Sequence, residues 1–167
     1  KFKLNPRINE NPYLDNQLKQ LEMQFNATKQ RLQNKFGTKK FIVYFQSFTN
    51  TYAPIATLKA LYEKALSFEN VIGLSIGTRT DCVTDEILDY LVDLSKDKEI
   101  WIEFGIQSFY DETLVNINRG DTADNMRYWI KRSKEKGLNV CGHLIYGLPK
   151  ETQEMMLETF RQTVELK

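Results

Sequence analysis

Four short apolar runs stand out along this chain and are separated by longer, more polar segments. The runs cover residues 41–45, 71–76, 100–106 and 140–146 and are rich in β-branched and aromatic residues. Continuous apolar runs of this length are typical of strands that are covered on both faces. Their starts lie about thirty residues apart, which is the length of one βα unit. The pattern therefore predicts four consecutive βα units.

The segments before and between the apolar runs show helical spacing of apolar residues. Gly37 is expected to end the first helix, and Asp111 is a candidate cap of a short one. In the last helix, Met156, Phe160 and Val164 are predicted to face the core. The expected helices cover residues 14–34, 55–66, 85–94, 111–117 and 121–136, with a last one from 152 onward.

Alternating strands and helices predict an α/β fold with a parallel sheet and right-handed crossovers. Both an open doubly wound sheet and an arc of a barrel satisfy this order, and four units are too few to close an eight-unit barrel. The first dozen residues, with Pro6 and Pro12, are expected to be irregular. Both ends of the chain are interpreted as cuts through a longer protein.

Composition narrows the class of protein. The chain has 167 residues, of which 41% are apolar and 27% charged, so a single domain over residues 1–167 is expected. Its 23 basic and 22 acidic residues nearly cancel, so bulk charge indicates no dedicated nucleic-acid or membrane surface. No apolar run approaches the roughly 20 residues that span a bilayer.

The two cysteines, Cys82 and Cys141, fit a reducing cytoplasm and are interpreted as small apolar fillers. Two thiols by themselves hold neither zinc nor an iron–sulfur cluster.

Polar residues follow each expected strand. In both parallel architectures, ligands bind at the carboxyl ends of the strands, so these residues are expected to share one small-molecule site. The candidates are Gln46, Ser47 and Thr49 after the first strand, Arg79 after the second, Gln107 and Arg119 after the third, and His143 and Gly147 in and after the fourth.

Several of these candidates also have a purely structural interpretation. Arg79 and Asp81 can form an ordinary surface ion pair, and His143 can be a hydrogen-bonded core residue. Glu103 lies inside an apolar strand, where an unpaired carboxylate is costly. Either Arg79 or Arg119 is the expected partner of Glu103.

The motifs that would define a reaction are absent from the sequence. It has no glycine-rich phosphate loop, Ser-His-Asp order, paired-histidine metal motif or Walker lysine. An aldolase-like barrel would place a lysine inside a strand, and none of the four expected strands contains one. The residues alone thus predict a small-molecule site and no particular chemistry.

Five motifs lie at the ends of the expected strands and in the segments that follow them. They are YFQSFTNTY at 44–52, GTRTDC at 77–82, EFGIQS at 103–108, NRG at 118–120 and CGHLIYGLPKE at 141–151. In their order and spacing, these motifs resemble the radical S-adenosylmethionine (SAM) superfamily. They resemble in particular its YhcC-like Fe–S oxidoreductases, in the branch with Elongator-type and oxygen-independent coproporphyrinogen oxidase enzymes. The resemblance covers residues 14–167.

The resemblance implies a segment of a partial (β/α)6 TIM-like barrel, with four parallel βα units preceded by a helix. The strands here would be strands 2 to 5 of that barrel, whose strand ends hold SAM and a four-iron four-sulfur cluster. In the family, a Cys-x-x-x-Cys-x-x-Cys loop after the first strand holds the cluster, and this sequence has no such loop. The fragment alone is therefore expected to be inactive, with Cys82 and Cys141 on the wrong strands to replace the loop.

The resemblance also implies roles for residues near the first strands. Gln46, Ser47 and Thr49 stand where relatives carry a glycine-rich turn that binds the SAM amino group. Arg79 is similar to a polar position that faces the methionine or ribose of SAM. Gln107 resembles a residue that contacts the ribose or the carboxylate.

Further along the chain, Arg119 resembles the arginine that pairs with the SAM carboxylate. His143 stands where a related enzyme carries an acid, which implies SAM binding or proton handling on the substrate. Ile145 and Gly147 resemble the segment that packs against adenine.

The function implied by the resemblance is that of a cytoplasmic Fe–S oxidoreductase. Such an enzyme cleaves SAM reductively to start radical chemistry on a substrate, which here is RNA, a protein or a small molecule. Its electron donor would be a flavodoxin or a ferredoxin. The alternative is a non-catalytic α/β module that binds a nucleotide or a protein through the same residues.

Overall fold

A four-stranded parallel sheet forms the centre of the chain, in the strand order β1-β2-β3-β4. The computed structural model describes residues 13–166, so the segment expected to be irregular lies outside the described residues. All four expected strands form, as β1 (Phe41–Phe45), β2 (Val71–Thr78), β3 (Glu99–Gln107) and β4 (Asn139–Leu144). The predicted α/β class and the partial, TIM-barrel-like arrangement of four parallel strands are thereby confirmed.

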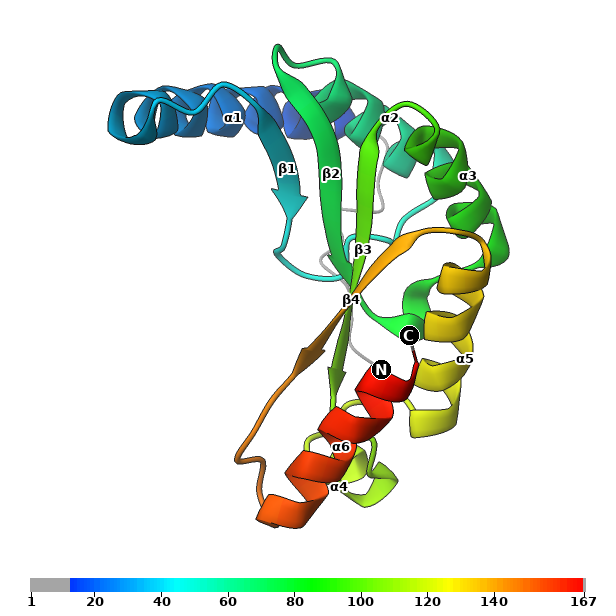
Figure 1. The fold of residues 1–167 in the computed structure, drawn as a ribbon. Coiled ribbons are helices and arrows are strands. Elements are labelled where there is room, and N and C mark those ends of the chain that lie inside the picture. Colours follow the sequence, from blue (N-terminus) through cyan, green and yellow to red (C-terminus); the bar gives the residue numbers. More distant parts are fainter. Residues whose placement is uncertain (1–12, 167) are drawn as a thin grey trace.

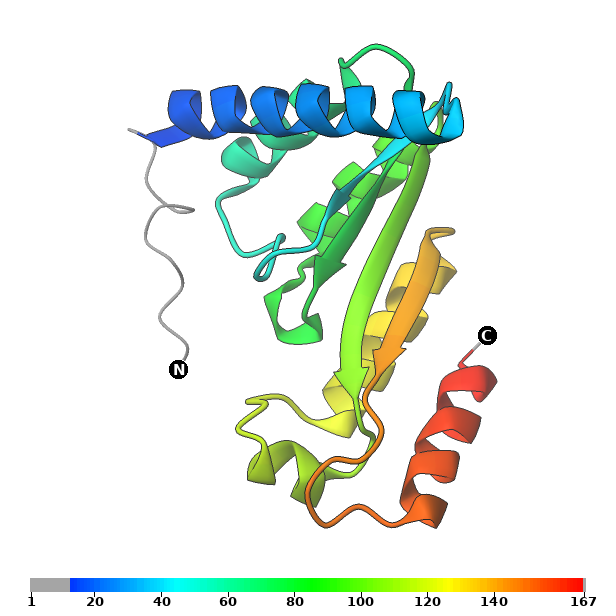
Figure 2. The same cartoon turned by 90° about the vertical axis from the view of Figure 1, so that its left-hand side faces the viewer.

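The helices are distributed unevenly around this sheet. Helices α2, α3 and α5 lie along one face, α6 lies beside β4, and α1 crosses the end of the sheet where β1 begins (Figures 1 and 2). Within residues 13–166, none of the helices is both long and apolar enough to cross a membrane. The helices are α1 (Leu14–Phe36), α2 (Ile55–Leu66), the 3-10 turn η3 (Thr80–Cys82), α3 (Asp85–Ser95), α4 (Asp111–Asn116), α5 (Ala123–Glu135) and α6 (Gln153–Glu165).

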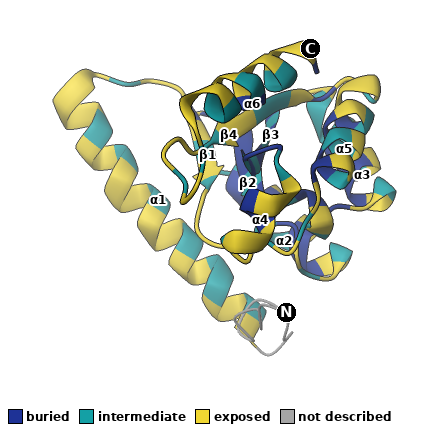
Figure 3. Cartoon of the chain, turned by 90° about the horizontal axis from the view of Figure 1, so that it is seen from below, coloured by how far each residue is buried: buried dark blue, intermediate teal, exposed yellow. Residues whose placement is uncertain are grey.

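The core lies between the sheet and the helices that cover it. Strand β3 alternates: Ile102 and Phe104 are completely buried on the helix side, whereas Glu103, Gly105 and Gln107 on the other side are partly exposed. We call this second side the inner face. Seen from the carboxyl ends of the strands, buried residues gather in the sheet and on the helices facing it, whereas α1 has no buried residue (Figure 3).

Helix ends follow the sequence signals in part. Gly37 takes the left-handed conformation with φ 65° and ends α1, as predicted. Asp111 does not cap its own helix α4: its carboxylate accepts a hydrogen bond from the backbone N–H of Ala123 at 2.8 Å. Asp111 therefore caps the first turn of α5, because the chain between the two helices folds back within reach of it.

The predicted core face of α6 is wrong. Phe160 is 49% exposed and Val164 36% exposed, and Met156 is only half-buried. The side of α6 that packs is instead marked by Thr159, whose hydroxyl accepts a hydrogen bond from Phe109 N at 3.3 Å. Thr163, one turn further along α6, lies beside β4: a Cβ atom built on Gly142 would be 3.4 Å from Thr163 Cγ2, so α6 presents small side chains to this strand.

We expect the replacement Thr122→Ala to lower the free energy of unfolding by about 0.5–2 kcal/mol. Thr122 is the N-cap of α5, and its Oγ accepts a hydrogen bond from Asn125 N at 3.2 Å. Urea unfolding of the protein measures the change. Lys131→Ala, at an exposed position of the same helix, is the matched control and should have little effect; equal losses in both variants would contradict the capping role.

Candidate cofactor-binding site

Gln107 and Arg119 fold over Gly105 on the inner face near the carboxyl end of β3. Arg119 Nη2 donates a hydrogen bond to the carbonyl oxygen of Gly105 at 2.5 Å. A Cβ atom built on Gly105 would lie 2.7 Å from Gln107 Nε2 and 3.3 Å from Arg119 Nη2. The three residues form what we call the Gly105 cradle, which depends on the missing side chain of the glycine.

The backbone at the end of β3 is unusual and turns Gln107 into this position. Gln107 has φ 62°, in the left-handed region that non-glycine residues rarely adopt. The pairing register with β4 shifts between Gly105 and Gln107, and the carbonyl of Gln107 accepts a hydrogen bond from Ile145 N at 3.1 Å. Backbone strain of this kind clusters at ligand-binding sites.

Two polar atoms of the cradle are buried without a hydrogen-bond partner. They are Gln107 Oε1 and Arg119 Nε, and the statement holds for the residues that the structure describes. Each buried, unpaired polar atom costs about 1–3 kcal/mol. A ligand that offers a donor to the amide oxygen and an anionic acceptor to the guanidinium would remove both costs.

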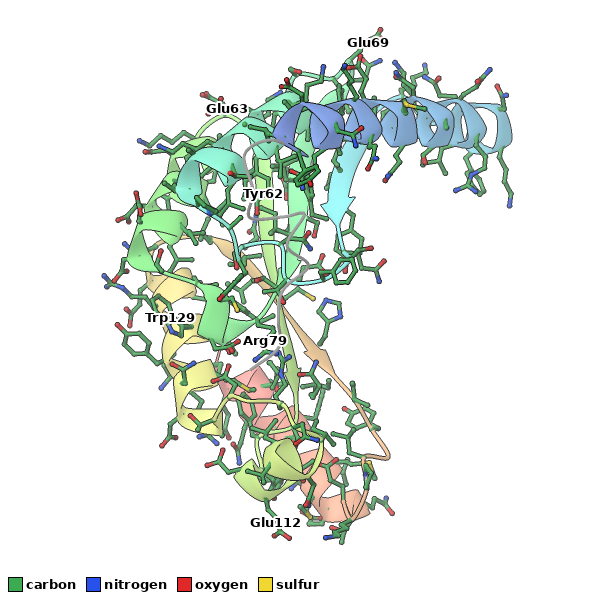
Figure 4. The ribbon with its side chains drawn as sticks, turned by 180° about the vertical axis from the view of Figure 1, so that it is seen from behind. Tyr62, Glu63, Glu69, Arg79, Glu112 and Trp129 are labelled. Carbon is green, nitrogen blue, oxygen red and sulfur yellow. The ribbon has the colours of Figure 1, made fainter. Side chains whose placement is uncertain are left out.

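Arg79, labelled in Figure 4, follows directly after β2 and contacts the backbone of a cradle residue, Arg119. Its guanidinium binds Asp81 through two hydrogen bonds of 2.7 and 2.5 Å and donates a third to the carbonyl oxygen of Arg119 at 2.9 Å. Arg79 therefore forms the ion pair that the structural interpretation anticipated, and it also fixes the backbone of Arg119. Burial lowers the pKa of the Arg119 guanidinium, and the charge of Arg79 lowers it further.

A second polar cluster lies deeper along the inner face, around Glu103. The Glu103 carboxylate accepts hydrogen bonds from Ser75 Oγ and from Tyr44 OH, the latter at 2.9 Å, and His143 Nε2 lies 2.6 Å from its Oε2. The expectation that Arg79 or Arg119 pairs with Glu103 is wrong, because both arginines lie at the strand ends while Glu103 is in mid-strand. Burial raises the pKa of Glu103, but the hydrogen bonds from Ser75, His143 and Tyr44 together bring it below its ordinary value.

His143 faces the same side of the sheet as the cradle. It pairs in register with Gly105, its side chain is 49% exposed, and its Nε2 lies 4.0 Å from Cys141 Sγ. Gln107, Arg119 and His143 thus share the inner face. His143 is therefore not a buried core residue. Cys141 is not a purely apolar filler either, because its thiol lies beside the imidazole of His143.

The loop after β1 lies two strands away from the cradle. Gln46 and Ser47 are exposed there, and Thr49 is half-buried. Asn50, in the same loop but not among the candidates, donates hydrogen bonds from Nδ2 to the carbonyl oxygens of Phe45 at 2.8 Å and Gly77 at 2.9 Å, and so ties the ends of β1 and β2 together. Asn50 therefore holds in place the loop that carries the candidates Gln46, Ser47 and Thr49.

The last two candidates belong to the segment that leaves β4. Ile145 is 45% exposed and is attached through its backbone N–H to Gln107, next to the cradle. Gly147 has φ 80°, and its N–H donates to Met156 Sδ at 3.1 Å. The structure thus brings Ile145 to the cradle, whereas Gly147 is held against α6.

Three inner-face residues outside the candidate set complete the site: Tyr44, Ser75 and Glu103. Each occupies a polar position inside an otherwise apolar strand. Tyr44 pairs with Ser75 in register, and Glu103 pairs with Cys141. Polar residues at alternating positions within the strands, rather than in the loops after them, are the signal that identifies this cluster.

An arc of parallel strands with polar side chains on its inner face and at its carboxyl ends is the arrangement in which barrel-type folds bind small molecules. The family model described as the radical SAM superfamily matches residues 13–163. The chain therefore belongs to the radical SAM superfamily.

Individual relatives agree with this assignment. The chain is 36% identical to YtqA of Bacillus subtilis over 154 residues, which cover 92% of this chain and 48% of that protein. It is 42% identical to YhcC of Escherichia coli K12 over 129 residues, covering 76% of this chain and 41% of that protein. The structure of an Elp3 from the archaeon Methanocaldococcus infernus has the same fold, with a TM-score of 0.69 and 23% identity over 85% of this chain and 38% of that one. The predicted YhcC-like and Elongator-like kinship is confirmed, and the chain spans about half the length of the curated relatives.

The chain's own residues do not fit the iron–sulfur cluster that the superfamily implies. A four-iron four-sulfur cluster is held by Cys thiolates, commonly four. The sequence contains two cysteines, and Cys82 lies in η3 while Cys141 lies in β4. The Gly105 cradle, with its unpaired buried donor and acceptor, does fit the amino-acid end of SAM, which carries both a carboxylate and an ammonium group.

Proposed function

We propose that the whole protein to which this chain belongs cleaves SAM reductively, and that the chain supplies the face on which SAM binds. The observation that carries the proposal is the pair of unpaired buried atoms, Gln107 Oε1 and Arg119 Nε, over a glycine on the inner face. The guanidinium suits the methionine carboxylate of SAM, and the amide oxygen suits a hydroxyl or ammonium donor. Membership of the radical SAM superfamily supports the choice of SAM over other amino-acid-like ligands.

Each neighbouring residue has a proposed task in this site. Arg119 binds the carboxylate, and Arg79 keeps the backbone of Arg119 in place through its 2.9 Å hydrogen bond. Ile145, half-exposed beside Gln107, offers apolar surface to the adenine ring. Gln46, Ser47 and Thr49 close the site from the loop after β1, which Asn50 holds to β2.

When both are bound to the whole protein, SAM and a reduced four-iron four-sulfur cluster would supply radical chemistry for the substrate. In this proposal the cluster's thiolates come from a Cys-x-x-x-Cys-x-x-Cys loop outside this sequence, and the present strands are strands 2 to 5 of the barrel. The electron donor is a flavodoxin or a ferredoxin, and the protein works in the cytoplasm as an oxidoreductase. The contribution of this chain is to orient SAM and to exclude water from it.

The test is an assay for 5′-deoxyadenosine with the whole protein, after anaerobic reconstitution with iron and sulfide and with a chemical reductant. We expect product to form only when SAM, iron and reductant are all present. The isolated 167-residue chain, which has two cysteines, should bind no cluster and form no product. If the whole protein binds SAM or another nucleotide but takes up no cluster, the alternative of a non-catalytic binding module replaces the proposal.

A further inference from the structure

Three residues of the inner face carry a set of donor atoms that the proposed SAM site does not use. A carboxylate oxygen of Glu103, Cys141 Sγ and His143 Nε2 all lie within 4.8 Å of one another. We propose that Glu103, Cys141 and His143 bind one zinc ion, with the fourth coordination position open toward the inner face. This inference goes beyond the proposed SAM chemistry and does not depend on it.

The geometry needs only small adjustments to hold the ion. Zinc bonds of about 2.0 Å to nitrogen and oxygen and about 2.3 Å to sulfur place tetrahedral ligand atoms roughly 3.3–3.7 Å apart. Here His143 Nε2 lies 2.6 Å from Glu103 Oε2 and 4.0 Å from Cys141 Sγ. These two separations therefore have to change by less than about 1 Å, and the third, between the Glu103 carboxylate and Cys141 Sγ, is at most 4.8 Å. The side chain of His143 is 49% exposed, so its ring has room on the solvent side to make that change.

The donor types select the metal. One imidazole nitrogen, one thiolate and one carboxylate oxygen, with an open fourth position, match the pattern of three protein ligands and an open position at catalytic zinc sites. Magnesium and calcium prefer all-oxygen sites, and an iron–sulfur cluster needs more thiolates than Cys141 provides. The charges also balance: the two charges of the zinc ion are neutralised by the Glu103 carboxylate and the Cys141 thiolate, so a partly buried ion is not left uncompensated.

Groups on two further strands already orient the carboxylate ligand. Ser75 Oγ on β2 and Tyr44 OH on β1 both donate hydrogen bonds to Glu103, whose side chain is only 16% exposed. Zinc ligands are commonly held in this way by outer hydrogen-bond partners. All four strands thus contribute to one arrangement centred on Glu103, and the open position faces the side of the sheet that carries the cradle.

Metal titration of the whole protein tests the site. The protein is stripped of metal with a chelator under anaerobic conditions, then titrated with Zn²⁺ alone and, in parallel, with Co²⁺ alone as a spectroscopic substitute. Because thiolates elsewhere in the protein also bind these ions, the readout is the difference between the wild type and the variants Cys141→Ser and His143→Asn. We expect each variant to bind one equivalent less zinc and to lose a thiolate-to-cobalt absorption band.

Two further variants sharpen the result. Cys82→Ser, at the chain's other cysteine, should leave the zinc stoichiometry unchanged, since Cys82 is outside the triad. Ser75→Ala should weaken zinc binding by about 10- to 100-fold without abolishing it, as loss of an outer hydrogen-bond partner does elsewhere. Equal zinc content in wild type, Cys141→Ser and His143→Asn would overturn the proposal, and so would loss of the cobalt band only in Cys82→Ser. His143 is exposed enough that its variant should fold even if Cys141→Ser does not.

Discussion

Replacing Arg119 with alanine is expected to weaken SAM binding to the whole protein about 10- to 150-fold. A hydrogen bond to a charged group contributes about 1.5–3 kcal/mol, and each 1.4 kcal/mol is a tenfold change in affinity. Arg119 Nε is buried and has no hydrogen-bond partner among the described residues, so we expect a bound carboxylate to pair with it. Isothermal titration calorimetry with SAM under anaerobic conditions measures the loss.

Two other arginine variants separate a loss of charge from a loss of the cradle. Arg161→Ala removes an exposed arginine of α6 that pairs with Glu154 and Glu158, and it should leave SAM affinity unchanged. Arg119→Lys keeps the positive charge but lacks the planar fork of donors. We therefore expect it to lose most of the SAM affinity that Arg119→Ala loses. Wild-type affinity in Arg119→Ala would contradict the assignment of the cradle.

We expect Gly105→Ala to weaken SAM binding at least tenfold while changing the stability of the fold only slightly. The new methyl group would lie 2.7 Å from Gln107 Nε2, which is the far end of a flexible side chain. The side chain can swing away at little cost to folding, but its carbonyl oxygen then leaves the position in which it meets the ligand. SAM titration and urea unfolding of the same preparation report the two effects separately.

Gly142→Ala is the matched control, because Gly142 pairs with Phe104 on the helix side of the sheet. A Cβ atom there would lie 2.7 Å from Cδ1 of the buried Ile106 and 3.4 Å from Thr163 Cγ2 of α6, although Gly142 itself is exposed. Overpacking of this kind costs about 1–3 kcal/mol, so this variant should lose stability and keep its SAM affinity. The reverse outcome, with Gly105→Ala destabilised and Gly142→Ala unable to bind SAM, would mean that the inner face is not the binding face.

Strand positions could be predicted from the sequence because the physical signal is local. A strand that is buried on its helix side, such as β3 around Phe104, needs apolar side chains at alternate positions whatever it packs against. The sequence does not predict which side of α6 faces the sheet. Thr159 and Phe160 are neighbours in the chain, so they lie on different sides of the helix, and either side could pack. Which of them turns inward is decided by the close packing of Thr163 near Gly142, a contact between segments distant in the sequence.

The candidate site was likewise predictable in part: the cradle residues could be found from the sequence, but the partners of Glu103 could not. The loop after β3 and the resemblance both pointed to Gln107 and Arg119, which the structure brings together over Gly105. The partners of Glu103 were missed because strand register, not sequence distance, sets them. Tyr44 and Glu103 are 59 residues apart in sequence and share a 2.9 Å hydrogen bond.

A crystal structure of the whole protein with SAM bound is the most direct test of the inner face as the cofactor site. We expect the methionine carboxylate of SAM to lie within about 3 Å of Arg119 Nε. A hydroxyl or ammonium group of SAM should lie at a similar distance from Gln107 Oε1. SAM bound elsewhere, with Gln107 Oε1 and Arg119 Nε still unpaired, would contradict the proposed site.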